Sequence, residues 1–192
     1  GYKAALNSNM LRELDYRNES DRQQKFRNAI RVSGLVVPEI YPLISNERVL
    51  VQSWEDGESL DAITNWSLAE RRSVAKILLQ TLFASLFDHG EVHGDPHLGN
   101  YLYRRDAIGR SEVVLLDFGC TIDIPREARL GLLNLILATR ENLDIDPLAC
   151  FQVLGFDGEK LSHLGRLLPS LCKILFAPVC VEHAFKTQEW NV

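Results

Sequence analysis

Two polar motifs joined by a predicted hairpin constrain the fold of this chain more than any other feature. The motifs are Val92-His93-Gly94-Asp95-Pro96-His97-Leu98-Gly99-Asn100 and Leu116-Asp117-Phe118-Gly119. Between them, residues 101–103 and 113–116 are rich in β-branched and aromatic side chains and flank a polar loop over 104–112, which is the pattern of a β-hairpin. Antiparallel pairing of these strands brings Asn100 and Asp117 to the same end of the hairpin.

Together the motifs read H-x-D-x-x-x-x-N followed by D-F-G, which is typical of kinase-type phosphoryl-transfer sites. Asp95 can accept a hydroxyl proton or hold a nucleophile in line. The Asn100 amide oxygen and the Asp117 carboxylate are hard ligands, suited to Mg²⁺ that bridges nucleotide phosphates. We group His93 with Asp95 as a catalytic-loop residue, and we expect it to brace the loop near Asp117 more than to act as a base. The alternative is an ordinary hairpin whose polar ends are solvated.

Helical and strand patterns along the rest of the chain predict an α+β fold. A charged amphipathic helix is expected over 11–30, followed by strand candidates at Val36-Val37 and over 49–54. Ser67 and Glu70 form a capping box that opens a helix with a broad apolar face. Later helices are expected over 125–140, with Leu130, Leu133 and Leu137 facing inward, over 147–154 and over 161–176.

This order of elements is that of a protein kinase-like fold from its regulatory helix onward. Residues 1–57 are expected to form an incomplete N-lobe, made of the regulatory helix and two strands, and residues 58–192 a mostly helical C-lobe. The polar connector 55–57 lies where a kinase hinge holds adenine through backbone groups. Glu55 and Gly57 are therefore candidate nucleotide-binding residues, on the analogy of the fold.

The chain resembles the AarF/UbiB (ADCK-like) atypical kinase family over most of its length, from about Leu11 onward. Asp95-Pro96-His97-Leu98-Gly99-Asn100 is close to the family's D-P-H-P-G-N, with Leu98 in place of the second proline. Glu13-Leu14-Asp15-Tyr16-Arg17-Asn18-Glu19 matches the family's E-x-D-x-x-x-E helix. The resemblance implies the C-terminal portion of a kinase-like domain that uses ATP and Mg²⁺. It also implies that Asp95 is the catalytic-loop aspartate and that Asn100 and Asp117 are the metal ligands.

The same resemblance assigns roles to the acidic residues of the N-terminal helix. Glu19 or Glu13 occupies the place of the helix glutamate that pairs with a β3 lysine, and we favour Glu19. Glu13 and Asp15 correspond to the family's acidic pair, which points toward the nucleotide site. The alternative is a solvated helix face with i,i+4 partners such as Asp21 and Lys25.

The chain departs from the family pattern before the helix. It has no V-A-x-K strand, no Gly- or Ala-rich phosphate loop and no K-x-G-Q segment, and Lys3 lies too near the helix to be the β3 lysine. We therefore expect a fragment, or a truncated reading frame, of a longer protein. The longer protein is expected to be an atypical kinase or ATPase, and whether these 192 residues alone turn over ATP is left open.

The leading hypothesis is an ATP-binding, Mg²⁺-dependent kinase or ATPase of the UbiB type, linked by resemblance to ubiquinone and isoprenoid-lipid metabolism. Its expected partners are a nucleotide and an isoprenoid lipid or quinone-biosynthesis proteins. One alternative is a small-molecule phosphotransferase of the aminoglycoside/choline kinase type, which shares His-Gly-Asp, the downstream Asn and a D-F-G-like turn. Another is a pseudokinase fragment that binds a nucleotide or partner without turnover.

Composition excludes some classes of function. A formal net charge of −5 argues against a general nucleic-acid binder. The four cysteines show no C-x-x-C spacing, so free thiols in a reduced compartment are expected rather than a zinc site. We expect no signal peptide, because the first residues lack a continuous apolar segment, and no transmembrane helix. A cytoplasmic location is expected, with peripheral membrane contact as a further option.

Overall fold

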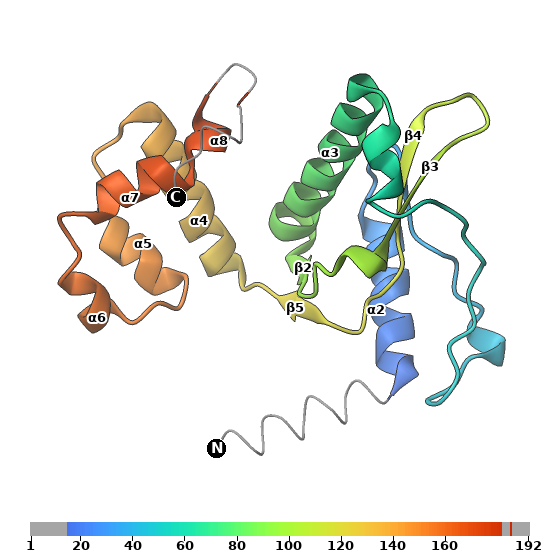
Figure 1. Ribbon diagram of the computed structural model, residues 1–192. Helices are drawn as coiled ribbons and strands as arrows, with labels where there is room; N and C mark the ends of the chain where they lie inside the picture. The colour runs from blue at the N-terminus through green and yellow to red at the C-terminus, as the bar shows by residue number, and fades with distance from the viewer. Residues whose placement is uncertain (1–14, 182–184, 186–192) are drawn as a thin grey trace. The chain divides into compact units, whose positions relative to one another are not determined.

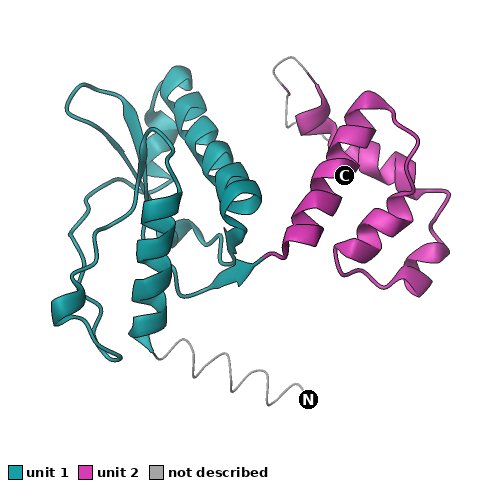
Figure 2. Ribbon diagram, turned by 180° about the vertical axis from the view of Figure 1, so that it is seen from behind, with its two compact units in different colours: residues 1–123 teal, residues 124–192 magenta. Residues whose placement is uncertain are grey.

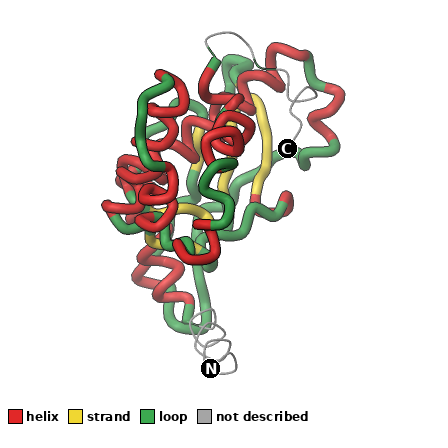
Figure 3. Tube along the Cα trace, turned by 90° about the vertical axis from the view of Figure 1, so that its left-hand side faces the viewer, coloured by secondary structure: helices red, strands yellow, loops and turns green. Residues whose placement is uncertain are grey.

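The computed structural model describes residues 15–181 and 185, and the chain divides into two compact units, residues 1–123 and residues 124–192 (Figure 2). Within the described residues, the strands belong to the first unit and the second unit is helical (Figure 3). The α+β class is therefore confirmed. Strand pairing in the first unit joins residues on both sides of position 57, and the lobe boundary expected there stays a prediction.

Helix α2 spans Tyr16–Ala29 and begins directly after Asp15, whose side chain accepts a hydrogen bond from the Arg17 N–H at 3.0 Å. An aspartate in this position caps the free amides of the first turn. Of the helix expected over 11–30, residues 16–29 are confirmed, and the extended backbone of Asp15 interrupts the helix at that position. Residues 11–14 lie outside the described residues. The buried residues of α2 are Ser20, Gln23 and Phe26.

Helix α3 spans Leu68–Phe83 and opens with the predicted capping box. The Ser67 hydroxyl accepts a hydrogen bond from the Glu70 N–H at 3.3 Å, and the Glu70 carboxylate accepts one from the Ser67 N–H at 2.8 Å. The chain continues through the π-helical turn η3 (Ala84–His89) and leaves the helix at Gly90, where φ is +85°. A positive φ favours glycine, so the sequence places this helix end correctly.

The first unit contains a three-stranded sheet in the order β1-β4-β3, of which Figure 1 labels β3 and β4. Its strands are β1 (Leu35–Val36), β3 (Tyr101–Arg105) and β4 (Ser111–Leu115). Strands β3 and β4 form the predicted antiparallel hairpin, whereas β1 pairs in parallel with β4. Val113 and Val114 of the central strand are fully shielded from solvent, as expected of a strand covered on both faces.

Two clusters of buried side chains hold α2 and α3 on this sheet. The α2 cluster contains Phe26, Ile30, Val37, Leu115 and Phe118. The α3 cluster contains Ile63, Trp66, Val74, Ile77, Tyr103 and Val113. Both clusters include side chains of β4, so the hairpin that separates the two sequence motifs is fixed by packing from both helices.

The second strand candidate, over 49–54, forms an irregular antiparallel ribbon instead of a regular strand. Isolated bridges join Ile40 to Gln52 and Asn46 to Val49. A 3-10 turn between the two bridges interrupts the ladder, which is why the strand pattern of the sequence is only partly realised. The 3-10 turns of the first unit are η1 (Pro42–Ile44), η2 (Ala62–Asn65) and η4 (Leu98–Asn100).

A second, two-stranded sheet frames the two sequence motifs. Its antiparallel strands are β2 (Glu91–His93), which leads into the first motif, and β5 (Thr121–Asp123), which follows the second. His93 lies opposite Thr121 in this pairing. The two ends of the segment between His93 and Thr121 are therefore joined by a short sheet.

The described part of the second unit consists of helices packed around an apolar cluster. They are α4 (Arg126–Glu141), α5 (Pro147–Val153), α6 (Gly158–Ser162), α7 (Leu168–Leu175) and α8 (Ala177–Cys180), around the cluster Leu135, Phe151, Leu168 and Cys172. The helix predicted over 161–176 is broken between α6 and α7. The inward face predicted for α4 was wrong at Leu130 and Leu137, which are 43% and 42% exposed, because α4 buries Leu135 and small residues instead.

None of the helices within 15–181 is long and apolar enough to cross a lipid bilayer.

Candidate active site

The β3–β4 hairpin brings the two motifs to one end of the sheet. Tyr101 pairs with Leu115, and the next ladder bond runs from the Leu116 N–H to the Asn100 carbonyl at 3.0 Å. Asp117 follows immediately, so Asn100 and Asp117 leave the hairpin at the same end. This juxtaposition was predicted from the strand pattern alone, and it is the geometry on which a shared metal ion depends.

The loop over 94–100, which is the expected catalytic loop, is held in shape by its own polar side chains. The Asp95 carboxylate accepts hydrogen bonds from the His97 N–H at 3.2 Å and from the Asn100 side-chain amide nitrogen at 3.3 Å. The same amide nitrogen also donates to the Asp95 carbonyl at 3.2 Å. Because the nitrogen of Asn100 is directed at Asp95, its amide oxygen is the atom available to a cation.

His93 links the two motifs through both ring nitrogens. Nδ1 accepts a hydrogen bond from the Asp95 N–H at 3.3 Å, and Nε2 lies 2.5 Å from the Asp117 carbonyl oxygen. A carbonyl oxygen can only accept a hydrogen bond, so Nε2 carries the proton and Nδ1 does not. This neutral tautomer has a hydrogen-bond partner at each ring nitrogen. The His93 ring therefore links Asp95 to Asp117, as expected of a residue that braces the loop. A role for His93 in the chemistry stays a prediction.

Asp117 shares its surroundings with Glu19 of α2. The Asp117 carboxylate accepts a hydrogen bond from the Gly119 N–H at 2.8 Å. A Cβ placed on Gly119 would lie 3.3 Å from Asp117 Oδ1 and 3.7 Å from Glu19 Oε2. Burial and the Asp117 charge both raise the pKa of Glu19, while the Phe118 N–H opposes them. A nearby cation would favour the charged form of a carboxylate whose pKa is raised in this way.

Phe118 anchors the D-F-G turn to the core of the first unit. It is completely buried, and its ring packs against Phe26 of α2 at 5.1 Å between centroids and against the His93 ring at 6.1 Å. Aromatic pairs in this distance range are attractive beyond the area that they bury. The D-F-G motif is therefore tied to α2 by an apolar contact at Phe118 as well as by the polar contact at Glu19.

Other predicted site residues have different local tasks. Asp15 caps α2 through the Arg17 N–H, and Glu13 lies outside the described residues. Glu55 is engaged by Arg104 at 2.9 Å and by the Ser53 hydroxyl at 2.9 Å. The structure therefore gives Glu55 a structural ion pair, and any adenine contact by the connector would use its backbone.

Gly57 is required by a close approach of two chain segments. A Cβ at this position would lie 2.7 Å from the Leu102 Cβ and 3.2 Å from the Tyr103 backbone. Glu58, the next residue, exchanges two backbone hydrogen bonds with Tyr103 at 2.7 and 2.9 Å. The connector is thus paired with β3, the strand that begins beside Asn100.

Sequence reasoning missed Arg22, which reaches the β2–β5 sheet from α2. Its guanidinium donates to the Glu91 carboxylate at 3.1 Å and to the Thr121 carbonyl at 2.8 Å. The available signal was its spacing, since a residue three positions after Glu19 lies on the same side of the helix. Its partners are distant in sequence, and no local pattern indicates them.

Comparison with known families decides the identity of this domain. A family model described as ABC1 atypical kinase-like domain matches residues 2–146. The chain belongs to the ABC1 atypical kinase-like family. The AarF-type resemblance seen in the sequence is therefore confirmed, and it favours this family over phosphotransferases of the aminoglycoside/choline kinase type.

Several curated members of the ABC1 family are similar to this chain. The chloroplastic aarF domain-containing protein kinase At1g71810 of Arabidopsis thaliana is 30% identical over 131 residues, which cover 68% of this chain and 18% of that protein. AarF domain-containing kinase 1 of Drosophila melanogaster is 35% identical over 134 residues, covering 68% and 26%. The mitochondrial atypical kinase COQ8B of Danio rerio is 29% identical over 114 residues, covering 59% and 18%. The chain thus spans about a fifth to a quarter of these relatives.

A solved structure supports the kinase-like fold of this ABC1 domain. The Rv3197–erythromycin complex from Mycobacterium tuberculosis superposes with a TM-score of 0.65 at 24% sequence identity, covering 89% of this chain and 43% of that one. At this identity the likeness concerns the fold alone.

The oxygen donors of the ABC1 site fit a magnesium ion better than a transition metal. Within the described residues there is no group of three or more His, Cys, Asp or Glu side chains that could hold a metal. Asn100 and Asp117 would supply two oxygen ligands, and Mg²⁺ commonly takes one or two protein ligands and completes its shell with waters and phosphate oxygens. Asn100 and Asp117 therefore fit a Mg²⁺ ion whose remaining ligands are waters and the phosphate oxygens of a nucleotide.

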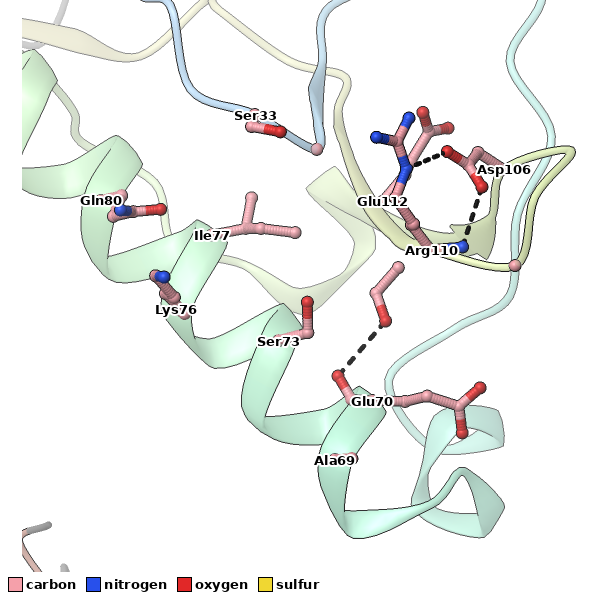
Figure 4. A pocket seen from close by; sticks show the side chains of 13 residues that line it. Ser33, Ala69, Glu70, Ser73, Lys76, Ile77, Gln80, Asp106, Arg110 and Glu112 are labelled. Atoms are coloured by element: carbon pink, nitrogen blue, oxygen red, sulfur yellow. Dashed lines mark hydrogen bonds and ion pairs between the residues drawn. The ribbon is translucent and has the colours of Figure 1, made fainter.

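A separate pocket of about 440 Å³ lies away from these motifs, between the first turns of α3 and the turn of the β3–β4 hairpin (Figure 4). Asp106 and Arg110 form an ion pair at its rim, and the Ser111 hydroxyl donates to the Glu70 carbonyl at 3.4 Å. Asp95, Asn100 and Asp117 do not line it. The candidate active site is recognised by its side-chain geometry rather than by the size of a cavity.

Proposed function

We propose that this ABC1 domain takes part in Mg²⁺-dependent phosphoryl transfer from ATP, to an acceptor or to water. The observation that carries the proposal is the meeting of three groups at one end of the β3–β4 hairpin. Asp95 is bonded to the Asn100 amide, and Asp117 lies beside Asn100 across the ladder. This arrangement supplies one carboxylate to position a nucleophile and two oxygen ligands for a metal.

Each residue has a defined task in this proposal. Magnesium would neutralise charge on the phosphates when bound, with the Asn100 amide oxygen and the Asp117 carboxylate as its protein ligands. Asp95 orients the attacking hydroxyl or water and accepts its proton. His93 keeps the catalytic loop and the D-F-G turn in register through its two hydrogen bonds.

Glu19 is proposed to receive a cationic partner beside the D-F-G turn. Its position against Asp117 and its raised pKa support a need for positive charge there. In a longer protein this partner would be a lysine of the preceding strand. Glu13 and Asp15 are proposed to influence the nucleotide phosphates by repulsion, an assignment that rests on the sequence resemblance.

The division into lobes belongs to the same proposal. Residues 1–57 would be the N-lobe portion and 58–192 the C-lobe, with adenine held by backbone groups of 55–57. The pairing of Glu58 with Tyr103 supports this, because it attaches the connector to the strand that begins beside Asn100. Links to quinone or isoprenoid-lipid metabolism, with peripheral membrane contact, rest on family resemblance alone.

Thermal unfolding with and without Mg·ATP tests the proposed function. A ligand that binds the folded state raises the melting temperature by mass action. We expect a rise in the wild type that requires Mg²⁺ and is reduced in Asn100→Ala and Asp117→Ala. Asp61→Asn is the matched control, because Asp61 is exposed and its side chain makes no capping hydrogen bond. An undiminished rise in both site variants would contradict the metal assignment.

A further inference from the structure

Arg22 connects α2 to both strands of the sheet that frames the motifs. Its guanidinium bonds the Glu91 carboxylate of β2 at 3.1 Å and the Thr121 carbonyl of β5 at 2.8 Å, and it also contacts the Thr121 hydroxyl. The side chains of Arg22 and Glu91 are only 20% and 10% exposed. A pair this well shielded from solvent is screened less by salt than a surface ion pair.

The β2–β5 sheet and the residues next to it contact the D-F-G turn and the chain that follows it. His93 of β2 is paired with Thr121 of β5, and its ring is bonded to the Asp117 carbonyl. Next to this pair, the Gly94 N–H donates to the Cys120 carbonyl at 2.6 Å. Contacts at the Asp117 carbonyl, at Cys120 and at Thr121 therefore attach the segment 117–121 to His93 and Gly94.

Arginine suits this position for geometric reasons. Its planar fork carries five N–H donors and can serve acceptors on two strands at once, whereas a lysine has the same charge without the fork. Glu91 also accepts a contact from His89 Nε2 at 3.1 Å. Removing Arg22 alone would leave the largely buried Glu91 carboxylate with only the His89 contact of these two.

We propose that Arg22 is a positioning residue for Asp117. By fixing both strands of the β2–β5 sheet on α2, it holds the Asp117 carboxylate in place beside Glu19. Glu19 and Arg22, three residues apart on one side of α2, hold the turn at its start and at its end. The proposal rests on the function proposed above for Asp117.

The first test measures magnesium dependence in the whole chain. We compare wild type with Arg22→Lys and titrate Mg²⁺ at constant ATP, following the thermal shift. The matched control is Arg17→Lys, on the same helix, where the arginine pairs with Glu47 and is 65% exposed. Loss of a residue that orients a metal ligand lowers metal affinity by about 10- to 100-fold. We expect an increase of at least about tenfold in the Mg²⁺ midpoint for Arg22→Lys, and none for Arg17→Lys.

The second test reports on the turn without any ligand. Hydrogen–deuterium exchange of the amides of residues 118–121 is expected to be faster in Arg22→Lys than in wild type or Arg17→Lys. If the wild type shows no response to Mg·ATP, the proposed function fails, and this exchange measurement still decides the role of Arg22. Equal exchange in the two lysine variants would overturn the proposal.

A double variant separates positioning from simple destabilisation. Arg22→Met with Glu91→Leu removes both charges and leaves no uncompensated buried carboxylate, because Asp123, the other carboxylate near Arg22, is 83% exposed. The fold is therefore expected to survive. A weakened Mg²⁺ response and fast exchange at residues 118–121 would support the positioning role. Wild-type magnesium dependence in this variant, or a lowered melting temperature with unchanged dependence, would show that Arg22 is structural only.

Discussion

The catalytic loop and the connector ribbon, by which we mean residues 40–57, both contain residues that the sequence predicts for the site, but the two segments use their polar side chains differently. In the loop, the Asn100 amide nitrogen and the backbone amides organise Asp95, and carboxylate or amide oxygens remain for a ligand. In the ribbon, Glu55 is engaged by Arg104, and the fully buried Gln23 donates to Gln52 at 2.7 Å. The comparison indicates that side chains do the proposed chemistry in the loop, whereas in the ribbon they maintain the fold.

The largest expected effect lies in the loop. Asp95→Asn removes the carboxylate that positions the nucleophile, and in a form of the protein that turns over ATP it should lower the rate by about 10²- to 10⁴-fold. Nucleotide binding should persist, because the metal ligands are unchanged. Single-turnover rates and nucleotide titrations measure the two quantities separately. A rate within a factor of two of wild type would remove Asp95 from the chemistry.

A stability effect without a metal effect is expected in the ribbon. Gly57→Ala forces a methyl group to within 2.7 Å of the Leu102 Cβ, and such overpacking costs about 1–3 kcal/mol. Urea unfolding measures the loss. The Mg²⁺ midpoint should stay unchanged when it is measured at saturating ATP, because Gly57 is proposed to contact adenine and not the metal. A shifted Mg²⁺ midpoint with unchanged stability would mean that the ribbon affects metal binding directly. That result would contradict the distinction between the loop and the ribbon.

The smallest expected effect comes from Glu19. Its pKa is raised in the folded state, so as pH rises above 4.5 the unfolded chain loses this proton before the folded chain does, and stability falls until pH passes the folded-state pKa. Glu19→Gln should therefore be slightly more stable than wild type at neutral pH, with the difference vanishing below pH 4.5. Urea unfolding across this range measures it. A variant that is less stable at neutral pH would contradict the proximity of Glu19 to Asp117.

Much of the structure around the motifs was predictable because its causes are local. The capping box at Ser67 and Glu70 fixes the start of α3, and the turn residues between two apolar segments define the hairpin that joins Asn100 to Asp117. The interruption at Asp15 was not predicted, because an aspartate inside a charged segment acts as a cap there. The family, and with it the kinase-like relation, also followed from the motif sequence.

What the sequence did not indicate depends on contacts between distant segments. The parallel pairing of Leu35 with Val113 and the bonds from Arg22 to Thr121 join residues that no periodicity relates. Glu55 was predicted as a nucleotide-binding residue from its position in the connector, but its ion pair with Arg104 depends on the register of β3. Such contacts are decided by packing of the whole unit, so they appear only in the structure.

The central claim, that Asn100 and Asp117 hold the metal of a nucleotide complex, is tested most directly by replacing Mg²⁺ with paramagnetic Mn²⁺ in the presence of ATP. The measurement is the broadening of NMR signals from the Asn100 side-chain amide and from the Asp117 and Gly119 backbone amides. The account predicts selective broadening of these signals in wild type and its loss in Asp117→Ala. Sharp signals at these positions, with broadening elsewhere in the chain, would contradict it.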